Sequence, residues 1–467
     1  MFNNTHMFTV GTNHYALDCK NIFFCLLDKK TQTHLKSLIC SDTHNFDDSL
    51  PSHVVSELVK SGYFVSDKQD TIVVVPQYDV MNISFAPVHE CNFSCAYCYA
   101  IGGERTQIHK MRFTEAKIDL LMNYIYFEKY SDFKKYKFDF VSGGEPLLNI
   151  ATLEYFLKTV RRVDTEHGKE TTVLIVTNGA LLTAEIINIL DRYDVFLGIS
   201  IDGPEATHNK HRKYKDGRGT YHDVVKGIST LRTSKSSSKI KNAWAMSVIT
   251  NKTGSLVNLM ETCVALGFNR MQMQLVRIPQ SHPLSFSNLE IARLKEHYID
   301  LISHILKHAA AGELSRIKMI ANDNDSFGKF ISRLLLRTPV YHRCFAGKNK
   351  VAIMANGEIY PCDSFCGESE FCMGSVFDSS LENTSIAKSF QEGHIQNRVS
   401  CSKCWARRLC GGDCYYNSYM KNGDIYIPDV AMCEMNKFFI QLAIDFLIKL
   451  KEINADYMNY LARFLNH

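Results

Sequence analysis

Three cysteines with the spacing C-x3-C-x2-C constrain this chain more than any other feature. Cys91, Cys95 and Cys98 directly follow a short, mostly apolar run at 82–88, which is typical of a strand, so their thiols are expected in a loop at its C-terminal end. Three thiolates cannot complete a tetrahedral structural zinc site. They can hold three irons of a [4Fe–4S] cluster and leave the fourth iron open. A zinc site with a distant fourth ligand, or reduced structural cysteines, remain open on the triplet alone.

The number and clustering of the cysteines also favour metal binding. The chain has 467 residues and 16 cysteines, and most of these lie either at 91–98 or after residue 343. A cytoplasmic chain keeps its thiols reduced, so clustered cysteines indicate metal ligands rather than disulfides. Four cysteines stand apart in apolar surroundings and are expected to be core residues: Cys19, Cys25, Cys40 and Cys263.

Charge and hydropathy exclude several other classes of protein. The net charge of +4 is too small to indicate nucleic-acid binding. No apolar run reaches the roughly 18 residues of a membrane span, and the N-terminus has no signal-peptide pattern. We therefore expect a cytoplasmic protein without a nucleic-acid or membrane partner.

Strands and helices are predicted to alternate from about residue 79 to 280. Amphipathic helices are predicted at 114–130, 151–163 and 182–192. Repeated strand–helix units imply an α/β fold with a parallel sheet, whose site lies at the C-terminal strand ends. The predicted strands are 82–88, 137–141, 172–177, 196–202, 243–249 and 271–276.

Two motifs fall at those strand ends. Gly143-Gly144-Glu145-Pro146 follows the second strand; paired glycines let the backbone approach a ligand closely, although a simple turn before a helix would look the same. Ser200 and Asp202 end the fourth strand, with Arg212 beyond them, and such groups can hold a ribose and a carboxylate. Gln274 on the sixth strand either points into the site or is solvated.

Seven cysteines return in the C-terminal part. They follow the pattern C-x12-G-x4-C, a gap, C-x2-C-x5-C-x3-C, a gap, and C. Seven thiols are too many for one four-ligand site and nearly enough for two, with two zinc sites as the alternative. These residues are Cys344, Cys362, Cys401, Cys404, Cys410, Cys414 and Cys433.

The remaining segments complete the predicted organisation. Residues 1–78 contain predicted strands at 15–18, 21–27 and 71–75 and a helix at 54–61, which suggests either a small winged-helix-like unit or an embellishment of the next domain. The segment 281–340 is predicted as a helical bridge. The predicted domains are 1–78, 79–280, 281–340, 341–435 and a C-terminal helix at 436–467.

Together these motifs resemble the radical S-adenosylmethionine (SAM) enzymes, and the later cysteines resemble their SPASM extension. The resemblance implies a partial (β/α)6 TIM-like barrel in which Cys91, Cys95 and Cys98 ligate the SAM cluster. It implies that SAM is held by Tyr97 at the adenine, by Gly143, Gly144 and Glu145 at the ammonium group, and by Ser200 and Arg212 at the ribose and carboxylate. Asp202 and Gln274 are assigned to the same cofactor site.

The SPASM resemblance implies two auxiliary [4Fe–4S] clusters, and therefore three clusters in all. Cys344, Cys362 and Cys414 match the first auxiliary cluster. Some relatives have a fourth ligand there, and 345–361 contains no cysteine. Either that cluster has an open iron, or Cys366 or Cys372 completes it. The second auxiliary cluster is matched by Cys401, Cys404, Cys410 and Cys433.

In function, the resemblance implies a maturase of a ribosomally made peptide, whose leader binds the N-terminal unit by strand addition. Thioether formation at a Cys sulfur is the first choice, with Asp363 as the base and a flavodoxin or ferredoxin as electron donor. The alternatives are an anaerobic sulfatase maturase and a carbon–carbon crosslinking or epimerising maturase. A zinc-binding interaction module is the non-enzyme alternative.

Overall fold

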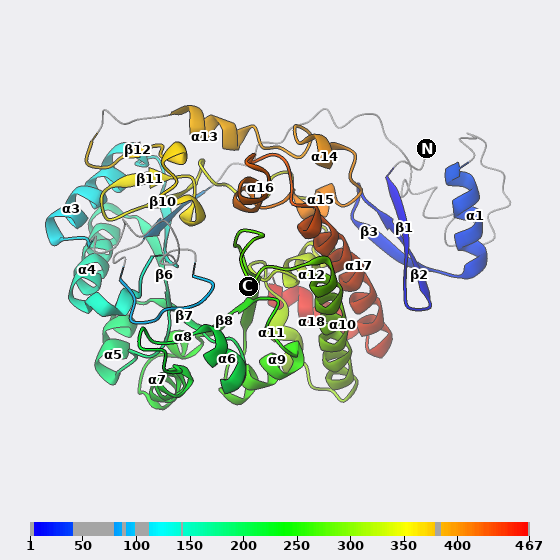
Figure 1. Cartoon of the computed structure of the whole chain (residues 1–467), viewed down its shortest axis with the longest axis horizontal. Helices are drawn as coiled ribbons and strands as arrows, with labels where there is room; N and C mark the ends of the chain where they lie inside the picture. The colour runs from blue at the N-terminus through cyan, green and yellow to red at the C-terminus, as the bar shows by residue number, and fades with distance from the viewer. Residues whose placement is uncertain are drawn as a thin grey trace. The chain divides into compact units, whose positions relative to one another are not determined.

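The computed structural model describes residues 4–40, 79–85, 90–98, 112–141, 143–378 and 384–465. They belong to two compact units that are interleaved along the chain. The first unit combines residues 1–76, 291–343 and 394–467, and the second combines residues 77–290 and 344–393. Figure 1 shows the elements of both units, coloured along the chain.

The second unit is built on a nine-stranded sheet with the order β12-β11-β10-β4-β5-β6-β7-β8-β9. From β4 to β9 every neighbouring pair is parallel. The predicted α/β fold and all six predicted strands are therefore confirmed. These strands are β4 (Val80–Phe85), β5 (Lys135–Phe140), β6 (Glu170–Thr177), β7 (Phe196–Ser200), β8 (Trp244–Ile249) and β9 (Met271–Leu275).

Three of the helices between these strands begin at side-chain caps. The hydroxyls of Thr114, Thr183 and Ser255 accept hydrogen bonds from backbone amides in the first turns of α3, α5 and α9. A π-helical segment at Tyr124–Lys129 directly continues α3. The helices are α3 (Glu115–Asn123), α4 (Ile150–His167), α5 (Ala184–Arg192), α6 (Glu205–His211), α7 (Tyr221–Thr233), α8 (Ser238–Lys241) and α9 (Leu256–Ala265).

One side of the sheet is aromatic where it packs on α4. The ring of Phe156 on α4 lies 5.3 Å from that of Phe85 and 5.0 Å from that of Phe140, centroid to centroid. Side chains alternate across a strand, so the intervening residues Ser84 and Asp139 lie on the opposite side. Both are buried, so this opposite side carries polar groups inside the unit.

Three further strands continue the sheet beyond β4. β10 (Lys350–Ile353) runs parallel to β4, and β11 (Glu358–Tyr360) and β12 (Gly374–Ser375) follow in antiparallel pairing. Lys350 thereby lies in register with Asn82 of β4. Helix α13 (Thr384–Gln391) ends this part of the second unit.

The first unit is a helical assembly with a small N-terminal sheet. The predicted bridge helices are found as α10 (Asn288–Ala310), whose first residues precede the unit boundary, and α12 (Gly328–Leu335), with α11 (Ser315–Ile320) between them. The tail is not one helix: α17 (Val430–Ile453) starts earlier than predicted, and α18 (Asp456–Leu465) follows a break after Asn454. The cysteine-rich part holds α14 (Val399–Ser402), α15 (Arg407–Cys410) and α16 (Tyr415–Asn422).

The N-terminal sheet packs against α17. It is antiparallel with the order β1-β2-β3, formed by β1 (Thr5–Val10), β2 (Asn13–Asp18) and β3 (Phe23–Leu27). The Tyr15 hydroxyl donates a 2.6 Å hydrogen bond to the Asp445 carboxylate of α17. Strand β1 and helix α1 (Lys29–Cys40) were not predicted from the sequence. The predicted helix at 54–61 and strand at 71–75 lie outside the described residues.

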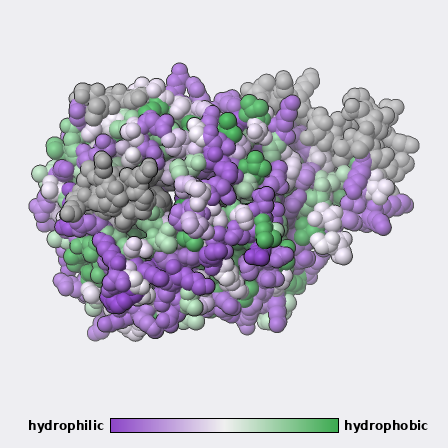
Figure 2. All heavy atoms as spheres, viewed as in Figure 1, coloured by the Kyte–Doolittle hydropathy of each residue, from purple (hydrophilic) through white to green (hydrophobic). Residues whose placement is uncertain are grey.

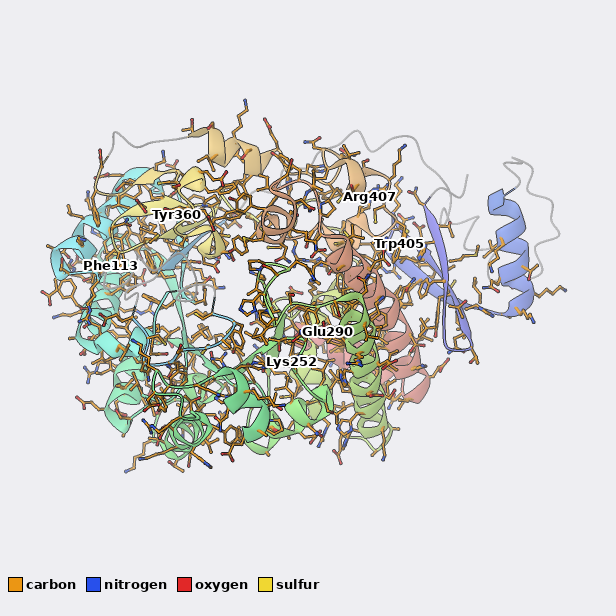
Figure 3. All side chains as sticks on the ribbon, viewed as in Figure 1. Phe113, Lys252, Glu290, Tyr360, Trp405 and Arg407 are labelled. Atoms are coloured by element: carbon orange, nitrogen blue, oxygen red, sulfur yellow. The ribbon has the colours of Figure 1, made fainter. Side chains whose placement is uncertain are left out.

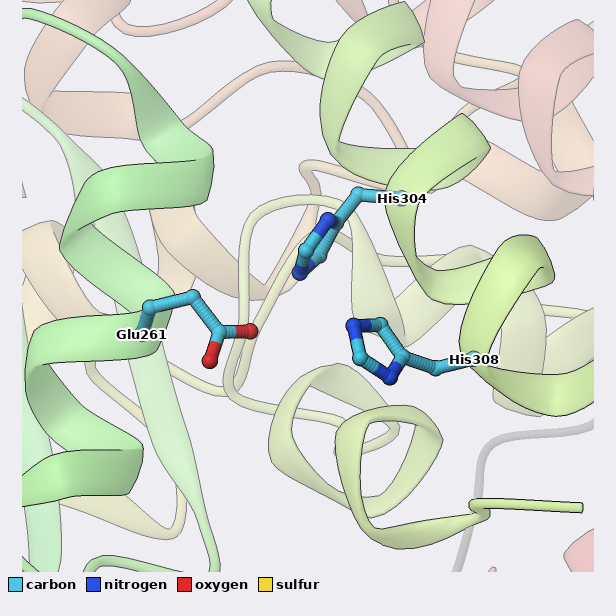
Figure 4. A group of neighbouring side chains, drawn as sticks. All are labelled: Glu261, His304 and His308. Atoms are coloured by element: carbon cyan, nitrogen blue, oxygen red, sulfur yellow. The ribbon is translucent and has the colours of Figure 1, made fainter. Parts of the chain in front are cut away.

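The histidines of α10 and the surface complete this description. His304 and His308 lie one turn apart on α10 and project from the same side, with ring centroids 4.6 Å apart (Figure 4).

On the face shown in Figure 2, hydrophobic residues are scattered among hydrophilic ones. Within the described ranges, no helix has the length and apolar character needed to cross a bilayer.

Candidate cofactor and cluster sites

The cysteine triplet lies in a loop after β4 that is tied to the segment following α6. The backbone amides of Ser94 and Ala96 donate to the carbonyl oxygens of Lys213 and His211, at 2.7 and 2.9 Å. The Cys98 amide donates to the Cys95 carbonyl at 3.0 Å, which closes a turn between two of the cysteines. Backbone hydrogen bonds therefore hold the loop in place, and none of these three bonds involves a thiol.

The three thiols of this loop lie close enough to affect one another. The pKa of Cys91 is raised from 9.0 to about 11, chiefly by burial, with smaller contributions in the same direction from Glu145 and Cys98. Burial likewise raises the pKa of Cys95 to about 12, with added effects of Cys98 and Cys91. Three converging thiols are a donor set suited to an iron–sulfur cluster, and binding iron would displace their protons. Their role as ligands stays a prediction.

The Gly-Gly-Glu motif packs directly against the start of the cysteine loop. The Glu145 amide donates a 2.8 Å hydrogen bond to the Glu90 carbonyl oxygen. A Cβ atom on Gly144 would lie 1.8 Å from that same oxygen, so only glycine fits here. The motif thus lets the loop after β5 pack closely against the loop after β4.

The carboxylate of Glu145 is buried and already has several partners. It accepts hydrogen bonds from the Thr177 hydroxyl (2.7 Å) and the Asn178 amide (2.7 Å) at the end of β6, and from the Leu147 amide (3.1 Å). Burial raises its pKa, although these hydrogen bonds oppose the shift. The predicted contact of Glu145 with the SAM ammonium group would add to this network.

Asp202, Arg212 and Tyr97 form a buried cluster beside the cysteine loop. The Arg212 Nε donates to the Asp202 carboxylate at 2.8 Å, and the Tyr97 hydroxyl donates to the same carboxylate. The other Asp202 oxygen accepts from the Val248 amide at 3.0 Å. Burial would raise the pKa of Asp202, but Arg212 and His208 lower it below its usual value. This pair therefore stays ionised and keeps the Tyr97 ring in a fixed place.

The other two predicted cofactor residues lie at the ends of their strands. Ser200 is the last residue of β7 and is nearly buried. Gln274 lies on β9, where its side-chain oxygen accepts a 3.4 Å hydrogen bond from Arg277. Both residues thus belong to the sheet whose strand β4 leads into the cysteine loop. Their contact with SAM stays a prediction.

Asn178 directly follows the third predicted strand, in a Thr-Asn-Gly sequence that is only a weak signal by itself. Its side-chain amide donates to the Asn92 side chain at 2.7 Å and lies 3.9 Å from the Cys91 sulfur. It therefore links the end of β6 to the cysteine loop. Its place directly after a predicted strand was the available signal.

The four cysteines predicted for the second auxiliary cluster lie together in the first unit. Burial raises the pKa of Cys433, and Asp413 and the thiols of Cys410, Cys401 and Cys404 raise it further. Cys433 comes from α17, whereas the other three come from the segment of α14 and α15. Such a convergent set of four thiols fits a four-cysteine cluster.

Two of the three cysteines predicted for the first auxiliary cluster lie in the second unit. Cys344 and Cys362 both act electrostatically on the ammonium group of Lys350, whose side chain is about one-third exposed, as does Asp139. Cys414, at the start of α16, belongs to the first unit, so this grouping of three stays a prediction. Cys366 and Cys372 both lie near Tyr360, and the choice between them as a fourth ligand stays open.

Asp363, the predicted base, lies beside the same lysine. The Lys350 Nζ lies 3.4 Å from the Asp363 carboxylate, and the carboxylate side chain is largely buried. Lys350 was missed from the sequence because its place depends on the pairing of β10 with β4.

Comparison with known proteins gives the family. Residues 86–251 match the Radical SAM superfamily, and residues 344–405 match the SPASM iron–sulfur cluster-binding domain. The chain is 22% identical over 435 residues to the radical SAM cyclopropyl synthase TigE of Paramaledivibacter caminithermalis, covering 88% of this chain and 87% of that protein. It is 24% identical over 368 residues to the cysteine-type anaerobic sulfatase-maturating enzyme of Clostridium novyi, covering 75% and 91%.

Solved structures share the fold. Native anSMEcpe with bound AdoMet has a TM-score of 0.65 at 19% identity, covering 80% of this chain and 99% of that one. The same protein with bound AdoMet and the Cp18Cys peptide has a TM-score of 0.64. The two matched domains imply [4Fe–4S] clusters and SAM binding. The chain therefore combines a Radical SAM domain with a SPASM domain, and over most of its length it is similar to a radical SAM cyclopropyl synthase and to anaerobic sulfatase-maturating enzymes.

Proposed function

We propose that this enzyme modifies a ribosomally synthesised precursor peptide by joining a Cys sulfur to a carbon in a thioether crosslink. When bound, the cluster and SAM supply a 5′-deoxyadenosyl radical that abstracts a hydrogen atom from an unactivated carbon. The convergence of thiols at Cys91, Cys95 and Cys98 beside the buried Asp202–Arg212 pair is the observation that carries the proposal. Here Tyr97, Gly143, Gly144, Glu145, Ser200, Asp202, Arg212 and Gln274 would bind SAM.

The balance of the reaction assigns a role to the remaining groups. Joining carbon to sulfur removes one C–H and one S–H bond: one hydrogen atom leaves with the radical, and one proton and one electron remain. We assign the proton to Asp363, whose carboxylate is largely buried and lies 3.4 Å from the Lys350 ammonium group. Auxiliary clusters would accept the electron, with Cys344, Cys362 and Cys414 holding one and Cys401, Cys404, Cys410 and Cys433 the other. That gives three clusters in all.

The N-terminal part supports a peptide with a leader as the substrate. Nearly all of anSMEcpe corresponds to 80% of this chain, so about a fifth of this chain has no counterpart there. We assign leader recognition to residues 1–78, whose described part consists of helix α1 and a three-stranded sheet with edges β1 and β3. An extended leader can bind such an edge by strand addition. A flavodoxin or ferredoxin is the proposed electron donor.

Anaerobic sulfatase maturation is the second candidate. Sulfatase-maturating enzymes of both the serine and the cysteine type are among the relatives. This activity would use Asp363 in the same place but would not need a leader-binding unit.

The test is coexpression of the enzyme with a small peptide encoded beside its gene, followed by measurement of the peptide mass. Thioether formation predicts a loss of two hydrogens per crosslink and the loss of one free thiol. Conversion of a peptide cysteine to formylglycine would support the second candidate instead. An unchanged mass with epimerised residues would contradict both. The Cys91→Ala enzyme, expected to leave the peptide unmodified, is the control.

A further inference from the structure

Helix α12 brings two cations to the candidate site of the second auxiliary cluster. Lys329 and Arg333 lie one turn apart on α12, so they share one face of the helix. Helix α12 packs against α15, which ends at Cys410. The Arg333 guanidinium donates to the carbonyl oxygens of Leu409 (2.6 Å) and Cys410 (3.4 Å). The positive charge of Arg333 is thus held against a predicted cluster ligand.

Lys329 is the less expected of the two. Lys329 is 5% exposed, and its ammonium group lies 4.8 Å from the centroid of the Phe330 ring. Arg343 and Arg333 repel this ammonium group, whereas Cys410 and the Asp325 carboxylate favour its charged form. Like charges on neighbouring turns repel each other, and burying a cation without a partner is costly. Within the described part of the chain, neither Lys329 nor Arg333 forms an ion pair with a carboxylate.

The two nearby carboxylates, Asp325 and Asp413, accept hydrogen bonds from backbone amides. Asp325 accepts hydrogen bonds from the Phe327 and Gly328 amides, at 2.8 and 2.7 Å, at the start of α12. Asp413 accepts from the Cys414 and Asp429 amides, at 2.7 and 3.0 Å. Both carboxylates are buried and are oriented by backbone amides, and the negative charge of Asp325 offsets part of the repulsion that Arg333 and Arg343 exert on Lys329.

A third cation, Arg398, holds the segment between Cys410 and Cys414. Arg398 is fully buried and donates to the carbonyl oxygens of Asp413 (2.9 Å) and Ile425 (2.5 Å). A Cβ atom on Gly412 would lie 2.3 Å from its guanidinium, so the glycine is needed for this approach. The guanidinium of Arg398 lowers the pKa of the Cys401 thiol, although burial raises it more. Cations thus flank the four cysteines from two sides.

An anion at the cysteines would resolve this excess of buried positive charge. Four thiolates around a [4Fe–4S] core carry a net negative charge, which grows on reduction. Nearby positive charge stabilises the reduced form more, and net charge and hydrogen bonding set the reduction potential of such clusters. We propose that Lys329 and Arg333 are counter-charges of the second auxiliary cluster that raise its reduction potential and so make it an electron acceptor. This rests on the cluster assignment in the proposed function.

The test is an anaerobic redox titration, followed by electron paramagnetic resonance, in a full-length background that keeps only this cluster. In that background Cys91, Cys95, Cys98, Cys344 and Cys362 are replaced by Ala. Lys329→Met is expected to shift the potential to more negative values, and Lys329→Arg is expected to restore it. Lys307→Met removes a charge from the exposed face of α10 and should leave the potential unchanged. Equal potentials in the Lys329→Met and parent proteins would overturn the inference.

Two further readouts separate a charge effect from a packing effect and from failure of the cluster assignment. In the iron-free protein, Lys329→Met is expected to melt at the same or a higher temperature, because it removes a buried cation whose repulsion by Arg333 and Arg343 is only partly offset by Asp325. A lower melting temperature of the iron-free Lys329→Met protein would indicate a packing role and overturn the inference. The same holds if the Lys329→Met protein retains no iron, so that its reduction potential cannot be titrated. Iron content that is equal with and without Cys401→Ala would refute the second cluster itself.

Discussion

The imidazole ring of His6 stacks on the indole ring of Trp405, with centroids 3.7 Å apart and planes inclined by 8°. His6 lies on β1, and Trp405 directly follows Cys404 in the cysteine-rich segment of the same unit, close to Arg407 (Figure 3). Burial lowers the pKa of His6 to about 4, so the ring is neutral at physiological pH. The N-terminal sheet is therefore joined to the loop of a predicted cluster ligand.

We expect this stack to couple the two segments energetically. Aromatic pairs contribute about 0.5–1.5 kcal/mol beyond their buried area. A double-mutant cycle with His6→Ala and Trp405→Ala, measured by denaturant unfolding, should give a coupling energy in that range. His14→Ala on β2, paired with Trp405→Ala, serves as the control and should give additive effects. Additivity in the His6 cycle would contradict the coupling.

Loss of the buried Asp202–Arg212 pair is expected to lower the free energy of unfolding far more than loss of an exposed pair of similar geometry. Asp202→Asn leaves a buried guanidinium without its partner, which costs about 3–5 kcal/mol. Asp216→Asn breaks the exposed pair with Arg218, also at 2.8 Å, and should cost far less because solvent screens both charges. The free energy of unfolding of the two iron-free variants checks this. Similar losses would show that Asp202 is not paired as described.

The iron-free protein is expected to lose stability in alkaline solution through its cysteine loop. The thiols of Cys91 and Cys95 have pKa values raised from 9.0 to about 11 and about 12 by burial, so their neutral forms are favoured in the folded state. Their contribution is complete below pH 9 and is lost as the pH rises through 11 to 12. Thermal unfolding should show a smaller decline in the variant with Cys91 and Cys95 replaced by Ala. Equal declines would contradict the burial of these thiols.

Lys350 is predicted to serve the base rather than the cleavage of SAM. Lys350→Met leaves the Asp363 carboxylate without the cation 3.4 Å away, so proton removal from the substrate should suffer. We expect 5′-deoxyadenosine still to form, while the modified peptide falls at least tenfold, as in Asp363→Asn. Lys137→Met, in the same register on β5, two strands away from β10, is the control. A parallel loss of 5′-deoxyadenosine would assign Lys350 to SAM binding or folding instead.

The sequence predicted the parts whose signals are local. The six parallel strands followed from apolar runs, and Gly144 was recognisable because its role depends on its immediate neighbours. Pairing between distant segments left no such signal. Lys350 meets Asp363 only because β10 joins the sheet beside β4, and Lys329 approaches Cys410 only because α12 packs on α15. The ion pair between Asp202 and Arg212 depends on how the loop after β7 folds back.

The number of clusters tests the account most directly. Iron counted in the anaerobically purified wild-type chain should be about twelve per molecule, as three [4Fe–4S] clusters require. Replacing Cys91, Cys95 and Cys98 with Ala should lower this to about eight and abolish 5′-deoxyadenosine formation. About four irons in the wild-type chain, or 5′-deoxyadenosine still formed by the triple variant, would contradict the account.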